Sequence, residues 1–184
     1  MPVQRLEFDQ LSTDLAQRLG PRVVRLGYLG EFFKCAAHQP EALAAFIDFT
    51  ETGKRSLESR MTEVIALTVA TWMGNSYERN QHERLCIRLG FAREWIRDVA
   101  ALDPDAASQM ADDELRLQRL VIAILESRGH GVGGVFEEIV EAIGQKAAIA
   151  ILMVIGRYVT HALIVNVLAL PPPVPSIFED DFTQ

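Results

Sequence analysis

The run Val64–Met73 constrains the fold of this chain more than any other segment, because it is almost wholly apolar. Read as a helix, it is apolar around its whole circumference, and such a helix is buried on all sides. Glu63 precedes the run and shares a helix face with Ala66 and Ala70. An unpaired carboxylate on that face would be costly. The run therefore predicts a helix inside a core, with Glu63 pointing along a buried face.

Helical periodicity also dominates the rest of the chain, and no alternating β-branched run is bounded by hairpin turns. Gly20-Pro21 is expected to end one helix, and the glycine-rich stretch 129–134 to form a flexible connection. These signals predict an all-α protein. The expected helices are Asp9–Leu19, Val23–Ala37, Glu41–Thr52, Leu57–Met73, Ser76–Leu89, Arg93–Ala101, Asp112–Ser127, Val135–Ile143 and Gln145–Leu168.

Length and charge limit the kind of protein this can be. The chain of 184 residues is long enough for one well-buried core and too short to require two domains. Apolar residues make up 49% and charged residues 23%, as in an ordinary soluble globular protein. The net charge of −7, with scattered lysines and arginines, argues against nucleic acid or an anionic membrane surface as a partner.

Cysteine usage and the apolar segments predict a cytoplasmic protein. Cys35 and Cys86 cannot build a disulfide framework, which favours a reducing compartment. The segment Met1–Asp9 lacks the apolar region of a signal peptide. The longest apolar stretch, Ala147–Leu170, is expected to be a helix buried in a core or between subunits, not a membrane span. The residues that interrupt it are Arg157, His161 and Asn166.

A polar stripe follows the apolar run. Asn75, Glu78, His82 and Cys86 follow one another at three- and four-residue steps. At about 100° per residue, these four side chains fall within a stripe roughly 80° wide on one helix face. A carboxylate and an imidazole brought together in this way can move protons at neutral pH. The stripe is therefore the predicted functional site.

The pattern Arg60-x-x-Glu63, an apolar helix, and then Tyr77-Glu78-x-x-x-His82 resembles the carboxymuconolactone decarboxylase family, which includes the alkylhydroperoxidase-like (AhpD-like) proteins. Members share a Glu on one helix and, on the next, a Cys-x-x-Cys-x-x-x-His motif or a cysteine-free variant. Glu63 matches the family Glu, and His82 matches the family His. The resemblance covers about residues 41–171 and implies an all-α, AhpD-like fold and a symmetric homo-oligomer, commonly a homotrimer or homohexamer.

The sequence departs from the redox-active members of this family. Asn75 and Glu78 stand where those members carry their two cysteines. Thiol peroxidase chemistry needs one thiolate to attack the peroxide and a second thiol to resolve the product. Cys86 lies on the same stripe but has no partner nearby in sequence. The resemblance thus points to the branch without the CxxC motif, whose named activity is decarboxylation of a lactone acid.

Three residues are the predicted catalytic groups. His82 could protonate the carbanion or enolate left when carbon dioxide departs, Glu63 could orient His82 and raise its pKa, and Glu78 could hydrogen-bond His82 directly. Each has a structural alternative: a core or interface histidine for His82, an ion pair with Arg60 for Glu63, and a helix-surface pair for Glu78. A metal site at these three is disfavoured, because no second His or Asp is apparent.

Three further residues are the predicted substrate contacts. Asn75 belongs to the stripe, and Tyr77 and Trp72 lie close enough to it to wall a pocket, although such large side chains are more often core. His161 is expected to be a satisfied buried histidine. The predicted organisation is an N-terminal helical extension over 1–40, a carboxymuconolactone decarboxylase-like domain over 41–171 and an acidic, proline-rich tail over 172–184. The tail is expected to wrap a neighbouring molecule or stay disordered.

These predictions converge on a cofactor-free, decarboxylase-like lyase that acts on a small organic acid or lactone. An electron sink in the substrate would remove the need for a cofactor, and the protein would supply positioning and a proton. One alternative is a peroxidase-related oxidoreductase that uses Cys86. Another is a non-catalytic oligomeric binding protein that has kept the pocket.

Overall fold

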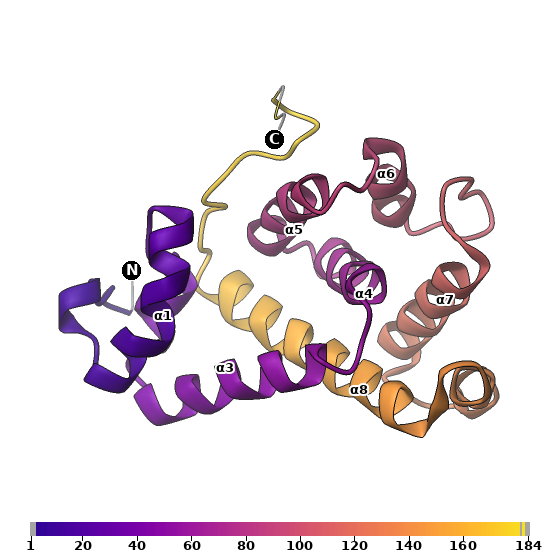
Figure 1. Ribbon diagram of the computed structural model, residues 1–184, viewed down its shortest axis with the longest axis horizontal. Coiled ribbons are helices and arrows are strands. Elements are labelled where there is room, and N and C mark those ends of the chain that lie inside the picture. The colour runs from indigo at the N-terminus through magenta and orange to yellow at the C-terminus, as the bar shows by residue number, and fades with distance from the viewer. Residues whose placement is uncertain (1–2, 181, 183–184) are drawn as a thin grey trace.

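The computed structural model describes residues 3–180 and 182, and within these residues the fold is all-α (Figure 1). The prediction of an all-α protein is therefore confirmed. A short 3-10 helix, η1, precedes eight α-helices. The elements are η1 Phe8–Gln10, α1 Thr13–Leu26, α2 Glu31–Ala36, α3 Pro40–Lys54, α4 Ser59–Trp72, α5 Ser76–Arg88, α6 Arg93–Ala101, α7 Asp112–Ser127 and α8 Gly133–Val167.

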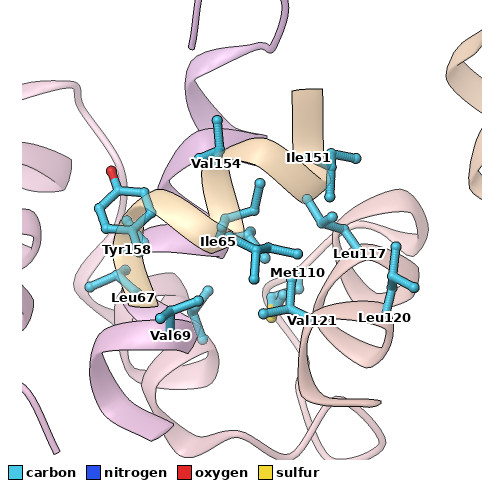
Figure 2. Packing of buried hydrophobic residues seen from close by; sticks show 14 of the residues in the cluster. Ile65, Leu67, Val69, Met110, Leu117, Leu120, Val121, Ile151, Val154 and Tyr158 are labelled. Atoms are coloured by element: carbon cyan, nitrogen blue, oxygen red, sulfur yellow. The ribbon is translucent and has the colours of Figure 1, made fainter. Parts of the chain in front are cut away.

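Helix α4 lies at the centre of the bundle. It packs against α5, α6, α7 and α8, which surround it in Figure 1. The side chains of Val64 to Val69 on this helix are all fully buried, as the apolar run predicted. Figure 2 shows Ile65, Leu67 and Val69 enclosed by aliphatic residues of α7 and α8, with Tyr158 at the edge of the cluster. Burial of this helix fixes the position of Glu63, which immediately precedes the apolar run.

Helix α8 is bent into two arms at Gly144, whose φ is +83°. The sequence predicted two helices that meet at this point, and the left-handed conformation, which glycine adopts without a Cβ clash, explains the bend. By length and composition α8 could cross a membrane, but 56% of its most apolar window is buried inside the protein. The core helix of a globular protein passes the same test.

The prediction that Gly20-Pro21 ends a helix is wrong. Helix α1 continues through Pro21 and ends at Gly27, which adopts a φ of +79°. A proline removes one backbone hydrogen bond but need not end a helix whose face is anchored by packing. Here Leu15 and Leu19, both buried, provide that anchor on the preceding turns. The second expected helix therefore starts later, and it is the short α2.

The first two helices pack on the same body as the rest of the chain. Leu15 of α1 and Phe32 of α2 share a buried cluster with Leu43 of α3, Tyr77 of α5 and Val165 of α8. The N-terminal helices thus cover one end of the contact between α5 and α8. This position brings the end of α1 close to the polar stripe.

In its described residues, 172–180 and 182, the acidic tail does not follow the prediction of a disordered or neighbour-wrapping arm. It packs along α5 of its own chain: Asn80 donates to the Val174 carbonyl at 2.9 Å, and Ser176 donates to Glu83 at 2.6 Å. Ile177 is fully buried, and its backbone N–H also donates to Glu83. The buried Glu83 carboxylate needs such donors, which explains why the tail is held here. The prolines of the tail are evident in the sequence, but the buried Glu83 carboxylate that accepts hydrogen bonds from the tail is not.

Candidate functional site

The site is built around a buried contact between Glu63 of α4 and His82 of α5. Glu63 Oε2 lies 2.5 Å from His82 Nδ1, and the two residues are only 3% and 7% exposed. An ionised carboxylate is only an acceptor, so Nδ1 carries the proton and donates to Glu63. In the neutral ring this leaves Nε2 as an acceptor. The contact therefore selects the tautomer of His82 and fixes the orientation of its ring.

Two groups face the other nitrogen of His82. The Tyr158 hydroxyl lies 3.4 Å from Nε2, and Glu78 Oε1 lies 3.5 Å from it. In the neutral ring the tyrosine hydroxyl donates to Nε2. After protonation, Nε2 becomes a donor to the carboxylate of Glu78. Nε2 can thus gain and lose a proton without being left unpartnered.

Glu78 is the centre of a second buried polar group. Its Oε1 accepts a hydrogen bond from Arg157 at 2.5 Å, and its Oε2 lies 3.1 Å from His161 Nε2. Asn75 Nδ2 lies 3.3 Å from His161 Nδ1, so the amide donates to Nδ1 when Nε2 carries the proton. Arg157 and His161 are one turn apart on α8 and are both buried. Glu78 connects this group to His82.

The pKa values differ between the parts of the site. Burial alone would lower the pKa of His82, but the neighbouring Glu63 and Glu78 raise it above its ordinary value. Burial lowers the pKa of His161 to about 4, so this ring is neutral at pH 7. Burial alone would raise the pKa of Glu78, but His161 and Arg157 lower it well below its ordinary value. At neutral pH the site therefore holds an ionised Glu78 and a histidine, His82, that is readily protonated.

A pocket of about 340 Å³ opens onto His82. Glu63 does not line it and lies behind the imidazole, as an orienting group would. Among the charged lining residues the basic ones outnumber the acidic ones, in contrast to the net charge of −7 of the whole chain. The basic lining residues are Arg22, Arg25, Lys54, Arg88 and Arg157. The acidic lining residues are Glu51 and Glu78.

The structure brings the three predicted catalytic residues together and separates the predicted substrate contacts. Asn75 caps α5 by accepting from the Glu78 backbone N–H, and its side chain lies behind His161, away from the pocket lining. Tyr77 lines the pocket, and its hydroxyl accepts from the Phe32 backbone N–H. Trp72 is 39% exposed and is not a pocket-lining residue, so the geometry gives its predicted substrate contact no support.

Cys86 lies next to the site but is shielded from solvent. Its side chain is 0% exposed, and its Sγ lies 3.6 Å from the same Oε2 atom of Glu63 that His82 contacts. Burial, together with the charge of Glu63, raises the pKa of the Cys86 thiol. A thiol in this setting is a weak donor to a carboxylate and not a ready thiolate.

No site role was predicted for Lys54, Arg157 or Tyr158, and His161 was expected to be a satisfied buried histidine. The sequence did contain a signal for a buried polar site on this helix, since Arg157 and His161 are four residues apart within an otherwise apolar segment. Polar residues at that spacing share a helix face, and a buried face needs partners for them. Among the described residues, no group of three or more His, Cys, Asp or Glu side chains is arranged to hold a metal ion.

The part of the chain that holds Glu63, Glu78 and His82 is similar to a known protein family. Residues 40–110, which include Glu63, Glu78 and His82, match the model of the carboxymuconolactone decarboxylase family. No curated protein matches the sequence. The fold is similar to a crystal structure from Ralstonia eutropha JMP134, described as an alkylhydroperoxidase AhpD core and an uncharacterized peroxidase-related protein. The TM-score is 0.79 at 16% identity, over 94% of this chain and 90% of that chain.

The two comparisons carry different weight. The sequence match confirms the predicted resemblance at the level of the family, and the structural match confirms the AhpD-like fold over nearly the whole chain. An identity of 16% carries the fold alone and transfers no activity. Lys54, Glu63, Glu78 and His82 lie within the matched segment, whereas Arg157 and His161 lie outside it.

Proposed function

We propose that this protein is a cofactor-free lyase of the decarboxylase type that acts on a small organic acid or lactone, with His82 as the general acid. The observation that carries the proposal is the buried Glu63–His82 contact behind a pocket in which basic residues outnumber acidic ones. A general acid works best when its pKa lies near the working pH, and the pKa of His82 is raised from its ordinary value. Burial alone would have driven this ring to the neutral form.

The chemistry follows from the two faces of the imidazole. The carboxylate of the substrate leaves as carbon dioxide, and the electron pair of the broken C–C bond moves into a neighbouring carbonyl. Protonated His82 then delivers its Nε2 proton to the carbanionic carbon, while Glu63 holds Nδ1 in place. A positioned general acid of this kind contributes about 10²- to 10⁴-fold to the rate. Glu78 supports the imidazolium from 3.5 Å.

The charge of the pocket supports an anionic substrate. Arg25 and Arg88 are exposed at the pocket, and Arg22 is half-buried with Glu51 3.9 Å away as its ion-pair partner. A concave surface of one charge concentrates ligands of the opposite charge. A carboxylate fits this requirement, and a neutral hydroperoxide would make no use of it. The basic lining therefore favours an organic acid over a peroxide as the substrate.

We further propose that the protein is a cytoplasmic homotrimer or homohexamer. Large apolar side chains of α3 and α8 are exposed, and a second hollow of about 340 Å³ lies among residues of these two helices. Exposed apolar side chains gathered on one face are typical of a subunit contact. The exposed residues are Phe49, Ile149, Leu152, Met153, Leu163 and Val167.

The proposed activity can be tested by NMR in heavy water with a panel of β-keto acids and carboxylated lactones. Wild-type protein should consume at least one substrate and incorporate deuterium at the carbon that loses carbon dioxide. His82→Gln should lose this activity by about 10²-fold or more, because it removes the proton donor. His130→Gln, at an exposed loop position, is the matched control and should behave as wild type.

Full turnover by His82→Gln would exclude the proposed mechanism. Loss of turnover together with loss of helical circular dichroism would leave a folding defect as the cause. His82→Asn, a smaller change at the same position, must then reproduce the loss of activity in a folded protein. Absence of turnover by wild type across the panel would count against the lyase and in favour of a binding protein or a thiol enzyme.

A further inference from the structure

We infer that Lys54 is a second reactive group of this pocket, an amine that condenses with the carbonyl of a keto-acid ligand to form an iminium ion. The inference rests on the proposed function, because the iminium is an electron sink for the same decarboxylation. It adds a covalent step to a site that otherwise supplies only a proton. Lysines that act in this way are desolvated or lie next to another cation.

The position of Lys54 meets both conditions. It lies at the end of α3, is half-buried and lines the same pocket as His82. Its Nζ lies 5.4 Å from the centroid of the Tyr158 ring, and Arg157 Cζ lies 4.4 Å from the same centroid. The amine thus shares an aromatic ring with a buried guanidinium. The hydroxyl of that ring is 3.4 Å from His82 Nε2, so one tyrosine contacts both the amine and the proton donor.

The partners of Lys54 differ from those of an ordinary structural lysine. Lys34 forms ion pairs with Glu7 at 2.9 Å and with Glu31 at 3.4 Å. Among the described residues no such ion pair holds Lys54, and its ammonium group lies over the Tyr158 ring. Glu78, which lines the same pocket, is already bound by Arg157 at 2.5 Å. The amine is therefore not committed to a carboxylate.

The electrostatic surroundings raise the neutral fraction of the amine above that of an ordinary lysine. Burial and the Arg157 cation lower the pKa of the Lys54 ammonium group, and the carboxylates oppose them only in part. Each unit by which the pKa of a lysine falls raises the neutral, nucleophilic fraction at pH 7 about tenfold. The charged groups that act on Lys54 from the surrounding helices are Glu51, Glu63, Glu78 and Arg157.

The proposed step balances as follows. The Lys54 amine attacks the ketone carbon, and the carbonyl oxygen takes up protons and leaves as water, which gives the iminium. The C–C bond to the β-carboxylate then breaks, its electron pair moves to the iminium nitrogen, and carbon dioxide leaves an enamine. His82 protonates the enamine carbon. Water finally hydrolyses the product iminium and returns the ketone and free Lys54.

The chain offers internal controls for a trapping experiment, because it has three lysines. Lys34 is ion-paired and Lys146 is exposed. The protein is incubated with levulinate, a keto acid that does not decarboxylate readily, and with cyanoborohydride, which reduces an iminium to a stable amine. Peptide mass spectrometry then reports the extent of adduct at each lysine. We expect the rate of modification at Lys54 to exceed that at Lys146, by about tenfold for each unit by which the pKa of Lys54 lies below its ordinary value.

Two variants sharpen the result. Lys54→Arg keeps the positive charge but cannot form the iminium, so the fast adduct should vanish. Lys146→Arg should leave it unchanged. Equal modification of Lys54 and Lys146 in the wild type would overturn the inference and leave Lys54 as a simple cation for the ligand carboxylate.

The test is independent of the proposed role of His82. His82→Gln should still form the levulinate adduct at Lys54, because condensation precedes proton delivery to carbon. An adduct at Lys54 in a protein whose turnover survives His82→Gln would support the inference and refute the role of His82. Absence of the adduct, with turnover that depends on His82, would refute the inference alone.

Discussion

The two buried histidines of the site differ in pKa although they share a neighbour. His82 is 7% exposed and His161 is 3% exposed, and each lies near one oxygen of Glu78. The pKa of His82 is raised, whereas burial lowers that of His161 to about 4. The difference comes from their other neighbours. His82 has a carboxylate of its own in Glu63, whereas His161 has the neutral Asn75 and lies near the Arg157 cation.

One carboxylate, that of Glu78, serves both halves of the site, the half around His82 and the half around His161. Arg157 keeps Glu78 ionised, and His161 with Asn75 holds its second oxygen without adding a charge. His161 therefore stays neutral and supports Glu78, and His82 is the histidine that takes up a proton. The following changes test this difference between His82 and His161.

The largest effect is expected from Arg157→Met. It removes the cation that pairs with Glu78 and leaves a carboxylate buried next to two histidines. Breaking a buried ion pair at one partner costs about 3–5 kcal/mol in the free energy of unfolding. Urea denaturation followed by circular dichroism measures this change. Arg119→Met, which breaks an exposed pair with Asp105, is the control and should cost about 1 kcal/mol or less.

The double variant Glu78→Gln/Arg157→Met should recover part of the lost stability, because no unpaired charge remains. A fall of less than about 1 kcal/mol in Arg157→Met would show that Glu78 does not depend on this cation for its charge.

The next effect is expected from Glu63→Gln, which keeps the shape and an acceptor oxygen but removes the charge next to His82. The pKa of His82 should fall below its wild-type value, because burial then acts against the imidazolium with less opposition. Turnover at neutral pH should fall by about 10²-fold as the protonated fraction decreases. NMR titration of labelled histidine measures the pKa without any substrate.

Glu83→Gln is the matched control for this change. Like Glu63, Glu83 is a buried carboxylate, but it lies on α5 and binds the C-terminal tail instead of the imidazole of His82. The titration of His82 should be unchanged in this variant. An equal fall of the pKa of His82 in both variants would indicate a general effect of net charge and not the Glu63 contact.

Parts of this site could be predicted from the sequence because they are local. Glu78 and His82 are four residues apart on one helix, so helical geometry alone places them together. Glu63 was predicted because the apolar run after it requires burial on all sides. The match of residues 40–110 confirms the resemblance to the family that this pattern predicted.

The other half of the site depends on packing that the sequence does not reveal. Arg157 and His161 reach Glu78 only because the second arm of α8 lies next to α5 in the fold. The Arg157–Glu78 contact joins two residues that are 79 positions apart in the sequence. Lys54 and Arg22 reach the pocket because α1 continues past Pro21 and α3 packs on α8. The predicted role of Trp72 rested on closeness in sequence, but the side chain lies at the exposed end of α4.

A smaller effect, with a defined pH range, is expected from His161. Its folded-state pKa of about 4 lies below the ordinary value of 6.5, so the unfolded chain binds its proton first as the pH falls. This residue therefore costs stability as the pH falls from about 6.5 towards 4, by up to about 1.4 kcal/mol for each unit of pH. His161→Asn should flatten this part of the profile. Urea unfolding between pH 4.5 and 6.5 measures the slope, and a slope unchanged from wild type would contradict the low pKa.

His82 should contribute the opposite dependence. Its raised pKa gives stability that is fully present below the ordinary value of 6.5 and is lost as the pH rises through the folded-state value. The Glu63→Gln variant should lose this alkaline decline while keeping the acid slope that His161 causes. Loss of both slopes in one variant would show that the two histidines titrate as a single unit.

The smallest effect is expected from Cys86→Ser, which tests whether the thiol belongs to the active half of the site. Serine keeps a donor to Glu63 Oε2 but exchanges a buried sulfur for a hydroxyl, so the free energy of unfolding should fall by about 1 kcal/mol. Turnover of an organic acid should stay within about twofold of wild type, because the thiol is buried and its pKa is raised. Cys35→Ser, at the other buried cysteine, is the control. Peroxide consumption by wild type that disappears in Cys86→Ser alone would place the thiol, and not the imidazole, at the centre of the chemistry.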